Sequence, residues 1–261
     1  MKIVKPKVFI VGKTEIDEEG LQAYLNHIGI PEWTSNAPSG AEKLCEFYGR
    51  LCYRSFKPGL NANVTKIRED NREYLQNIAK VRHGSVVEHP VVNFVFADVS
   101  RVFTHELVRH RVGTAISQES LRFVRLTDLS FWAPTVISEN EQFMEIAVKT
   151  FEQLEEVQKG LAAMLELDAE GKLFGDKKIA TSAMRRLAPE GLATTIGWSA
   201  NFRTLRHTLE MRTDPGAEEE IRLVFGEVGR LMQERYPNEF SDYETEMVKG
   251  LPWFKTPNRK I

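Results

Sequence analysis

Short strands set among longer amphipathic helices are the feature of this sequence that most constrains its fold. Val91 to Phe96 is the clearest strand, because its β-branched and aromatic side chains alternate between two faces. Asn201 to Arg212 is the clearest helix, with Phe202, Leu205 and Leu209 on its apolar face. We find no internal repeat, low-complexity segment or linker between domains. The sequence therefore predicts one α+β domain spanning the whole chain.

The same signals predict further elements on both sides of that strand. Serine followed three residues later by glutamate marks a helix start, and this capping box occurs at Ser39 and again at Ser138. Helices are predicted over residues 17–27, 39–53, 64–82, 99–110, 138–167, 178–187, 201–212 and 216–236. A buried strand is predicted at 8–11, an extended segment at 120–126, and a strand or turn at 192–199. Gly84 is predicted as a helix cap, Gly113 as a helix end, residues 168–176 as a polar linker and the segment after Trp253 as a loose tail.

Composition excludes several classes of protein. With 42% hydrophobic and 28% charged residues, the 261-residue chain has the balance of an ordinary soluble globular protein. A net charge of -2 gives no support for bulk nucleic-acid binding. Cys45 and Cys52 are too few for a disulfide framework or a four-ligand metal site. The N-terminal apolar run is too short to span a membrane and lacks a signal-peptide pattern, so we expect a cytoplasmic protein with no membrane or nucleic-acid partner.

The stretch from Thr104 to Arg125 is strongly basic although the chain is not. It holds two glutamates against four arginines and two histidines: Arg109, Arg111, Arg122, Arg125, His105 and His110. A guanidinium group presents a planar fork of donors that fits phosphate, and its charge does not titrate away. An isolated run of arginines is more often a solvated helix face. Here Arg101, His105 and Arg109 fall at steps of four, so the predicted helix places them on one face.

Two further clusters accompany this basic stretch. His83 to His89 contains Ser85 and Glu88, and a downstream group contains Arg185, Asn201, Arg203, His207 and Arg212. Each residue taken alone also has a structural explanation: Glu88 and His89 as a buried pair, or Arg203 paired with Glu210 or Glu219. Four of the six histidines lie between positions 83 and 110, which favours a polar site there.

Several common sites are absent from the sequence. No GxGxxG motif follows a strand and no GxxxxGK[ST] motif occurs, so neither a dinucleotide-binding Rossmann site nor a P-loop is supported. No serine lies in a GxSxG motif. His105 and His110 are five residues apart, and no HExxH zinc motif is complete, so no metal site is expected. The remaining interpretation is a phosphate-bearing ligand held by arginines.

At this point the motifs resemble a known family. Arg109-His110-Arg111, eight residues, and then Ser120-Leu-Arg122 resemble the RHR…S signature of the flavin-dependent thymidylate synthases. His83-Gly-Ser-Val-Val-Glu-His89 is similar to the HxSxxEH element of that family, and Gly49 to Tyr53 is similar to its early helix. The downstream residues fall in the family's order: Arg185, Pro189, Asn201, Arg203, His207 and Arg212. The resemblance covers roughly residues 40–240 of a single domain expected over 1–261.

The resemblance implies a fold and a reaction. The fold would be α+β, with a central, mostly antiparallel sheet flanked by helices, in a homotetramer with FAD and substrate at subunit interfaces. The reaction would be reductive methylation of dUMP to dTMP. Methylenetetrahydrofolate would give the carbon, NADPH would reduce FAD, and the flavin would pass a hydride to the pyrimidine, without an enzyme nucleophile. Independently of the resemblance, Cys52 lies in a helix with an apolar pattern, so we expect it to pack in the core.

The resemblance also implies roles for particular residues. The expected FAD contacts are Ser85, Arg109, His110, Arg111, Gln118, Asn201, Arg203 and His207. The expected dUMP contacts are Glu106, Arg109, Gln118, Ser120, Leu121, Arg122, Arg185 and Arg212. Among them Arg122 would anchor the phosphate, and Arg212 would be the catalytic residue that favours the ionised N3 of the pyrimidine. Phe123 stands where the family usually has tyrosine, and the eight-residue gap before Ser120 is long for the family.

Two other functions fit the same residues. One is a related C5-methylase acting on UMP, because nothing in the sequence visibly reads the 2′ position. The other is a non-catalytic nucleotide- or RNA-binding protein that uses the arginine cluster. RNA binders usually add exposed aromatic side chains for stacking. The basic stretch and the residue before it hold only Phe103 and Phe123, which we expect to lie in the core.

Overall fold

The computed structural model describes residues 1–124 and 126–259 of the chain. Arg125, the last arginine of the basic stretch, therefore lies outside the described residues. The helices, including two 3-10 helices marked η, are α1 (Glu18–His27), α2 (Gly40–Tyr53), α3 (Asn71–Lys80), η1 (Gly84–Glu88), α4 (Arg101–Leu107), α5 (Thr135–Ser138), α6 (Glu141–Met164), α7 (Phe174–Met184), η2 (Arg185–Leu187), α8 (Phe202–Arg212) and α9 (Glu219–Arg235). The strands are β1 (Lys2–Ile3), β2 (Lys7–Lys13), β3 (Val91–Ser100), β4 (Thr114–Gln118), β5 (Ser130–Phe131), β6 (Ala193–Asn201), β7 (Glu244–Val248) and β8 (Leu251–Lys255).

The chain divides into two compact units. Unit 1 contains residues 1–9, 95–109 and 116–198, and unit 2 contains residues 10–94, 110–115 and 199–261. No helix among the described residues is long and apolar enough to cross a membrane. The prediction of a single domain over the whole chain remains a prediction.

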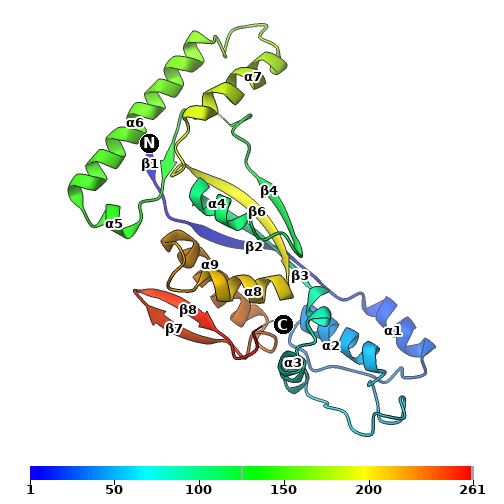
Figure 1. Ribbon diagram of the computed structural model, residues 1–261. Coiled ribbons are helices and arrows are strands. Elements are labelled where there is room, and N and C mark those ends of the chain that lie inside the picture. The colour runs from blue at the N-terminus through cyan, green and yellow to red at the C-terminus, as the bar shows by residue number, and fades with distance from the viewer. Residues whose placement is uncertain (125, 260–261) are drawn as a thin grey trace. The chain divides into compact units, whose positions relative to one another are not determined.

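A four-stranded sheet within the described residues has the order β2-β3-β6-β4, drawn as arrows in Figure 1. The amide of Arg101 donates to the carbonyl of Leu192, and the amide of Phe202 donates to the carbonyl of Pro90. The start of each strand in the β3–β6 pair thus meets the end of the other, so these strands are antiparallel. The predicted α+β class with an antiparallel sheet is confirmed.

The two central strands bury one face each, as the alternation predicts. In β3 the side chains of Val92, Phe94 and Phe96 are buried, and in β6 those of Ile196 and Trp198 are buried. The prediction for β2 is wrong in one respect, because this edge strand leaves Phe9 and Val11 exposed rather than buried.

Unit 1 has its own apolar core. Leu121, Leu129, Phe131, Phe151 and Leu192 form one buried cluster, in which the rings of Phe131 and Phe151 are 4.6 Å apart. The helices α6 and α7 lie alongside each other (Figure 1), and Gln158 Nε2 on α6 donates to the Met184 carbonyl at the end of α7 over 3.1 Å.

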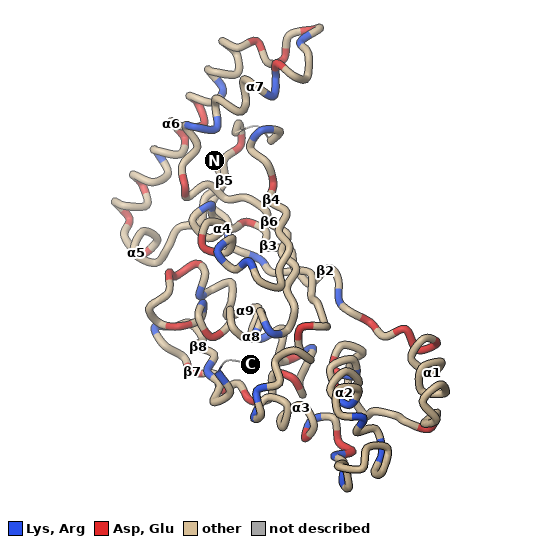
Figure 2. Tube along the Cα trace, turned by 45° about the vertical axis from the view of Figure 1, so that its right-hand side comes forward, with Lys and Arg blue, Asp and Glu red and all other residues tan. Residues whose placement is uncertain are grey.

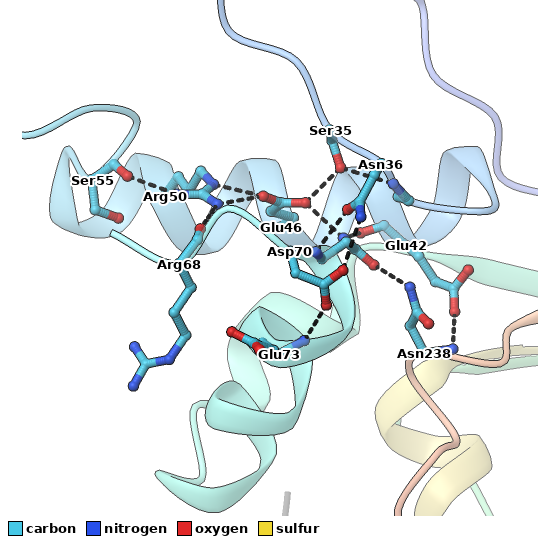
Figure 3. A network of polar contacts seen from close by, with 12 residues as sticks. Ser35, Asn36, Glu42, Glu46, Arg50, Ser55, Arg68, Asp70, Glu73 and Asn238 are labelled. Carbon is cyan, nitrogen blue, oxygen red and sulfur yellow. Dashed lines mark hydrogen bonds and ion pairs between the residues drawn. The ribbon is translucent and has the colours of Figure 1, made fainter. Parts of the chain in front are cut away.

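Unit 2 is tied together by buried polar side chains of α2 (Figure 3). Ser39 caps this helix as predicted, since its hydroxyl accepts from the amide of Glu42 over 3.2 Å. Glu46 receives two hydrogen bonds from the Arg50 guanidinium group, and Asn71 donates to its other oxygen. Oε1 of Glu42 accepts from the backbone amides of residues 238 and 239. Because these groups are buried, they hold α2 in one position relative to α3 and the segment after α9.

Several predicted boundaries are wrong, and local hydrogen bonds give the reason. Asp70 accepts from the Glu73 amide and starts α3 seven residues later than predicted; Gly84 starts η1 instead of capping α3. Asn140, and not Ser138, caps α6. The helix after the linker begins at Phe174 and not at residue 178. Residues 254 and 255, predicted as part of a loose tail, are ordered in β8, which extends to Lys255, and Phe254 is buried.

Two further corrections affect the candidate site. The helix α4 ends at Leu107, so Arg109 lies beyond it and does not share a helical face with Arg101 and His105. Residues after Ser120 form a turn instead of an extended segment, because the amides of Phe123 and Val124 both donate to the Ser120 carbonyl.

Candidate functional site

In unit 2, the loop that carries His110 and Arg111 is fastened to the start of α8. The side-chain oxygen of Asn201 caps α8 by accepting from the backbone amide of Thr204 over 2.9 Å. The backbone amide of Asn201 donates to the Gly113 carbonyl. The Thr204 hydroxyl donates to the Val112 carbonyl over 2.7 Å. The polar residues at the start of α8 therefore fix the basic loop, which explains why Asn201 belongs with the RHR motif.

Gly113 allows this close approach. Its φ is +68°, and a Cβ there would lie 2.5 Å from Asn201 Nδ2 and 2.6 Å from Thr204 Oγ1. Gly113→Ala should therefore lower the free energy of unfolding by about 1–3 kcal/mol, measured by urea denaturation. Gly160→Ala, near the C-terminal end of α6, is the matched control, because a Cβ there meets nothing within 4 Å. That change should stabilise the protein by about 0.5–1 kcal/mol, and equal effects of the two substitutions would contradict the role of Gly113.

The imidazole of His110 accepts a hydrogen bond from Arg212, the last residue of α8. Arg212 Nε donates to His110 Nε2 over 2.8 Å, and the His207 ring lies 6.3 Å from the His110 ring. Burial and the neighbouring charges of Arg212 and His207 lower the pKa of His110 to about 4. His110 is therefore neutral at physiological pH, with its proton on Nδ1, and it orients the Arg212 guanidinium group.

This arrangement makes stability depend on pH. The pKa of His110 is lower in the folded protein than its ordinary value of 6.5. The unfolded chain binds more protons between about pH 4 and 6.5, so folding is destabilised as the pH falls through that window. The melting temperature of wild type should fall more between pH 7.5 and 5.0 than that of His110→Gln. Contributions from groups that the two proteins share cancel in this comparison, and parallel losses would contradict a neutral His110.

The helix η1 places a second set of predicted residues beside α8 in unit 2. Glu88 forms an ion pair with Arg203, and both side chains are about half exposed. The alternatives are thus wrong: Arg203 does not pair with Glu210 or Glu219, and Glu88 does not form a buried pair with His89. The His89 ring instead stacks on Tyr48 with a centroid distance of 3.6 Å, and Ser85 is exposed on η1.

In unit 1, a polar cavity of about 520 Å³ lies where β4, α4 and η2 meet. Its lining is Arg101, Gln118, Glu119, Ser120, Leu121, Arg185, Arg186, Ala188 and Glu190. Thr195 donates its amide to Glu119 over 3.2 Å, and the Thr194 hydroxyl donates to the same oxygen over 3.4 Å. The cavity therefore combines fixed polar groups with three guanidinium groups, which is the composition of an anion site.

The cavity brings together some of the predicted substrate residues. Gln118, Ser120, Leu121 and Arg185 line it, whereas Glu106, Arg109 and Arg122 are not among the lining residues. Arg122 is exposed, and its carbonyl accepts from the Thr181 hydroxyl. The sequence interpretation missed five lining residues as site residues: Arg101, Glu119, Arg186, Ala188 and Glu190. Two signals were available: Arg101 shares a predicted helical face with His105, and Arg186 and Glu190 directly follow Arg185 and Pro189.

The donors of unit 2 suit an anionic cofactor. The Arg111 side chain is exposed and has no hydrogen bond or ion pair within the part of the chain that the structure describes. Arg203 and His207, four residues apart on α8, are also exposed. Guanidinium and imidazole groups of this kind match the charge of a dinucleotide pyrophosphate, so these residues fit FAD chemically.

Metal and cysteine chemistry find no support in the described residues. They contain no cluster of three or more histidine, cysteine, aspartate or glutamate side chains placed to hold a metal ion. Cys45 is buried, and burial raises the pKa of its thiol well above the ordinary value, which opposes formation of a thiolate. Cys52 is exposed, so the prediction that it packs in the core is wrong.

Figure 2 shows positive and negative residues interspersed along the trace, without a long segment of one sign.

Comparison with known proteins agrees with this site chemistry. A family model described as thymidylate synthase complementing protein (Thy1) matches residues 35–238. A flavin-dependent thymidylate synthase of Corynebacterium glutamicum is 36% identical over 220 residues, covering 83% of this chain and 85% of the relative. The enzyme of the same name from Mycolicibacterium gilvum is 34% identical over 229 residues, covering 87% and 89%.

Two solved structures share the fold at low sequence identity. A UMP/dUMP methylase, PolB, from Streptomyces cacaoi, bound with 5-Br UMP, has a TM-score of 0.61 at 16% identity, covering 92% of this chain and 94% of that one. Thymidylate synthase X from Helicobacter pylori, with FAD and dUMP, has a TM-score of 0.55 at 18% identity, covering 90% and 99%.

The matches define the class of protein as a flavin-dependent enzyme of nucleotide biosynthesis. The chain belongs to the flavin-dependent thymidylate synthase family. The family predicted from the sequence motifs is thus confirmed.

Proposed function

We propose that this protein catalyses the reductive methylation of dUMP to dTMP with bound FAD. Methylenetetrahydrofolate is the carbon donor and NADPH the reductant. The family membership supports the reaction, and the cavity in unit 1 carries the substrate part of the proposal. Its three arginines and Ser120 offer donors for a phosphate group, and its volume of about 520 Å³ lies in the range of small-molecule sites.

The phosphate of dUMP is assigned to the cavity. Arg185 and Ser120 face the same space, so a guanidinium fork and a hydroxyl group are available to one phosphate. Gln118 is oriented there by donating to the Thr104 hydroxyl over 3.4 Å, and Leu121 closes the apolar side. Glu106, Arg109 and Arg122 remain predicted nucleotide contacts.

Arg212 is assigned to the pyrimidine ring. Its guanidinium group is half-buried and is held by the neutral His110 ring, so one of its N–H groups is already used for orientation. A fixed cation beside the ring favours the form of the base that has lost the N3 proton. No side-chain nucleophile is needed for this effect.

FAD, when bound, supplies the hydride that reduces the methylene group on the pyrimidine. This chain contributes the donors that hold it: Ser85, Arg109, His110, Arg111, Gln118, Asn201, Arg203 and His207. The ion pair with Glu88 limits the freedom of the Arg203 side chain. The Asn201 cap fixes the loop that carries His110 and Arg111. A homotetramer would place donors from several copies around one flavin, and it remains part of the proposal.

UMP is the second candidate substrate, because the Streptomyces cacaoi protein that shares the fold is named a UMP/dUMP methylase. The test is a competition between dUMP and UMP in one reaction with FAD, methylenetetrahydrofolate and NADPH. Chromatography of the products should show dTMP in clear excess over 5-methyl-UMP. Equal or greater methylation of UMP would favour the second candidate. Methylation of neither nucleotide would refute both.

A further inference from the structure

The three arginines of the unit 1 cavity lack acidic partners. Within residues 1–124 and 126–259, the side chains of Arg101, Arg185 and Arg186 form no hydrogen bond or ion pair. Basic side chains elsewhere in unit 1, such as Lys149 and Lys159, pair with glutamates of α6. Since all three unpaired guanidinium groups line one cavity, they form a cationic group that is open to an anionic ligand.

The two carboxylates that line the same cavity have their own interactions. One oxygen of Glu119 accepts from the Thr195 amide and the Thr194 hydroxyl. An oxygen of Glu190 lies 3.8 Å from His105 Nδ1. Neither carboxylate forms an ion pair with the three arginines among the described residues, so the three guanidinium groups stay available to a ligand.

The cavity offers more guanidinium groups than one phosphate requires. A phosphate monoester carries about -1.5 to -2 at pH 7, which two guanidinium groups already match. A diphosphate ester adds a further anionic phosphate, and three guanidinium groups match its larger charge. We propose that Arg101 and Arg186 add a second anion subsite beside Arg185, so that the cavity binds pyrimidine nucleoside 5′-diphosphates at least as tightly as monophosphates. This inference rests on the proposed function, which places the nucleotide phosphate in this cavity.

Equilibrium titration of the purified full-length protein with dUMP and dUDP tests the inference. The titrations use one fixed salt concentration and no divalent cation, with wild type, Arg101→Gln and Arg186→Gln. Lys149→Gln is the matched control, because it removes one positive charge of unit 1 outside the cavity. Circular dichroism establishes that each variant is folded.

Wild type should bind dUDP at least as tightly as dUMP. Each arginine variant should lose about 10-fold or more in affinity for dUDP, the range expected for a hydrogen bond to a charged group, with a smaller loss for dUMP. Lys149→Gln should bind both as wild type does. Wild-type binding of dUMP with ten-fold weaker binding of dUDP, or equal losses for both nucleotides in the variants, would overturn the second subsite alone. Binding of neither nucleotide would instead refute the proposed function.

Discussion

Arg212→Ala should lower the rate of dUMP methylation by about 100-fold or more, the size of effect seen when one group aimed at developing charge is removed. The reason is the geometry of the pair with His110: the neutral imidazole accepts from Arg212 Nε over 2.8 Å and holds the guanidinium group in one orientation. Without this cation, loss of the N3 proton from the pyrimidine becomes harder. The measurement is single-turnover formation of dTMP by the variant and by wild type.

The pH dependence of that rate distinguishes a role at the ring from a role at the phosphate. Wild type should reach its plateau at a less alkaline pH than Arg212→Ala, because the cation favours the N3 anion. Arg212→Lys should recover only part of the rate, since lysine offers a point charge without the planar fork. Flavin content should be the same in all three proteins. Identical pH profiles, with only the affinity for the phosphate changed, would show that Arg212 has another role.

Arg206→Met should give the largest loss of stability, about 3–5 kcal/mol, as expected when one partner of a buried ion pair is removed. Arg206 is buried on α8 and forms two hydrogen bonds with the Asp242 carboxylate, over 2.9 and 2.6 Å. Glu239 lies 3.6 Å from the same guanidinium group, and burial raises its pKa to about 8. The variant leaves the carboxylate of Asp242, which is only 10% exposed, charged without its cation. Urea denaturation gives the free energy of unfolding.

Arg230→Met is the matched control for this prediction. Arg230 pairs with Glu227 and Glu234 on the exposed face of α9, so its loss should cost less than about 1 kcal/mol. Arg206→Met combined with Asp242→Asn should be less destabilising than the sum of the single changes, because the double variant leaves no unpaired charge at residue 242. Additive losses would mean that Arg206 acts through packing alone.

Local patterns predicted the elements whose signals lie within a few residues. Asn201 combines a capping side chain with the apolar face of Phe202, Leu205 and Leu209, and α8 follows as expected. The β7–β8 hairpin was missed because its signal is a two-residue turn at Lys249 and Gly250, both with positive φ. The start of α3 was misplaced because residues 64–70 were assigned to the helix, whereas Asp70 caps it and the helix begins at Asn71.

The candidate site was predictable in part for the same reason. His110, Arg203, His207 and Arg212 lie in segments with recognisable motifs, and the structure brings them together in unit 2. Arg101 and Arg186 carry no motif, and only the antiparallel β3–β6 pairing brings the start of α4 near the loop before β6. Convergence of this kind depends on sheet topology, which the local sequence does not encode.

The most direct test of the central claim is the dependence of dTMP formation on flavin. Purified protein stripped of FAD is mixed with dUMP, methylenetetrahydrofolate and NADPH. The rate of dTMP formation is then measured as FAD is added in increasing amounts. The proposed function predicts no dTMP without FAD and a rate that saturates as FAD binds, together with a shift in the flavin absorption spectrum. Formation of dTMP at the same rate without FAD, or no dTMP in the complete mixture with FAD bound, would contradict it.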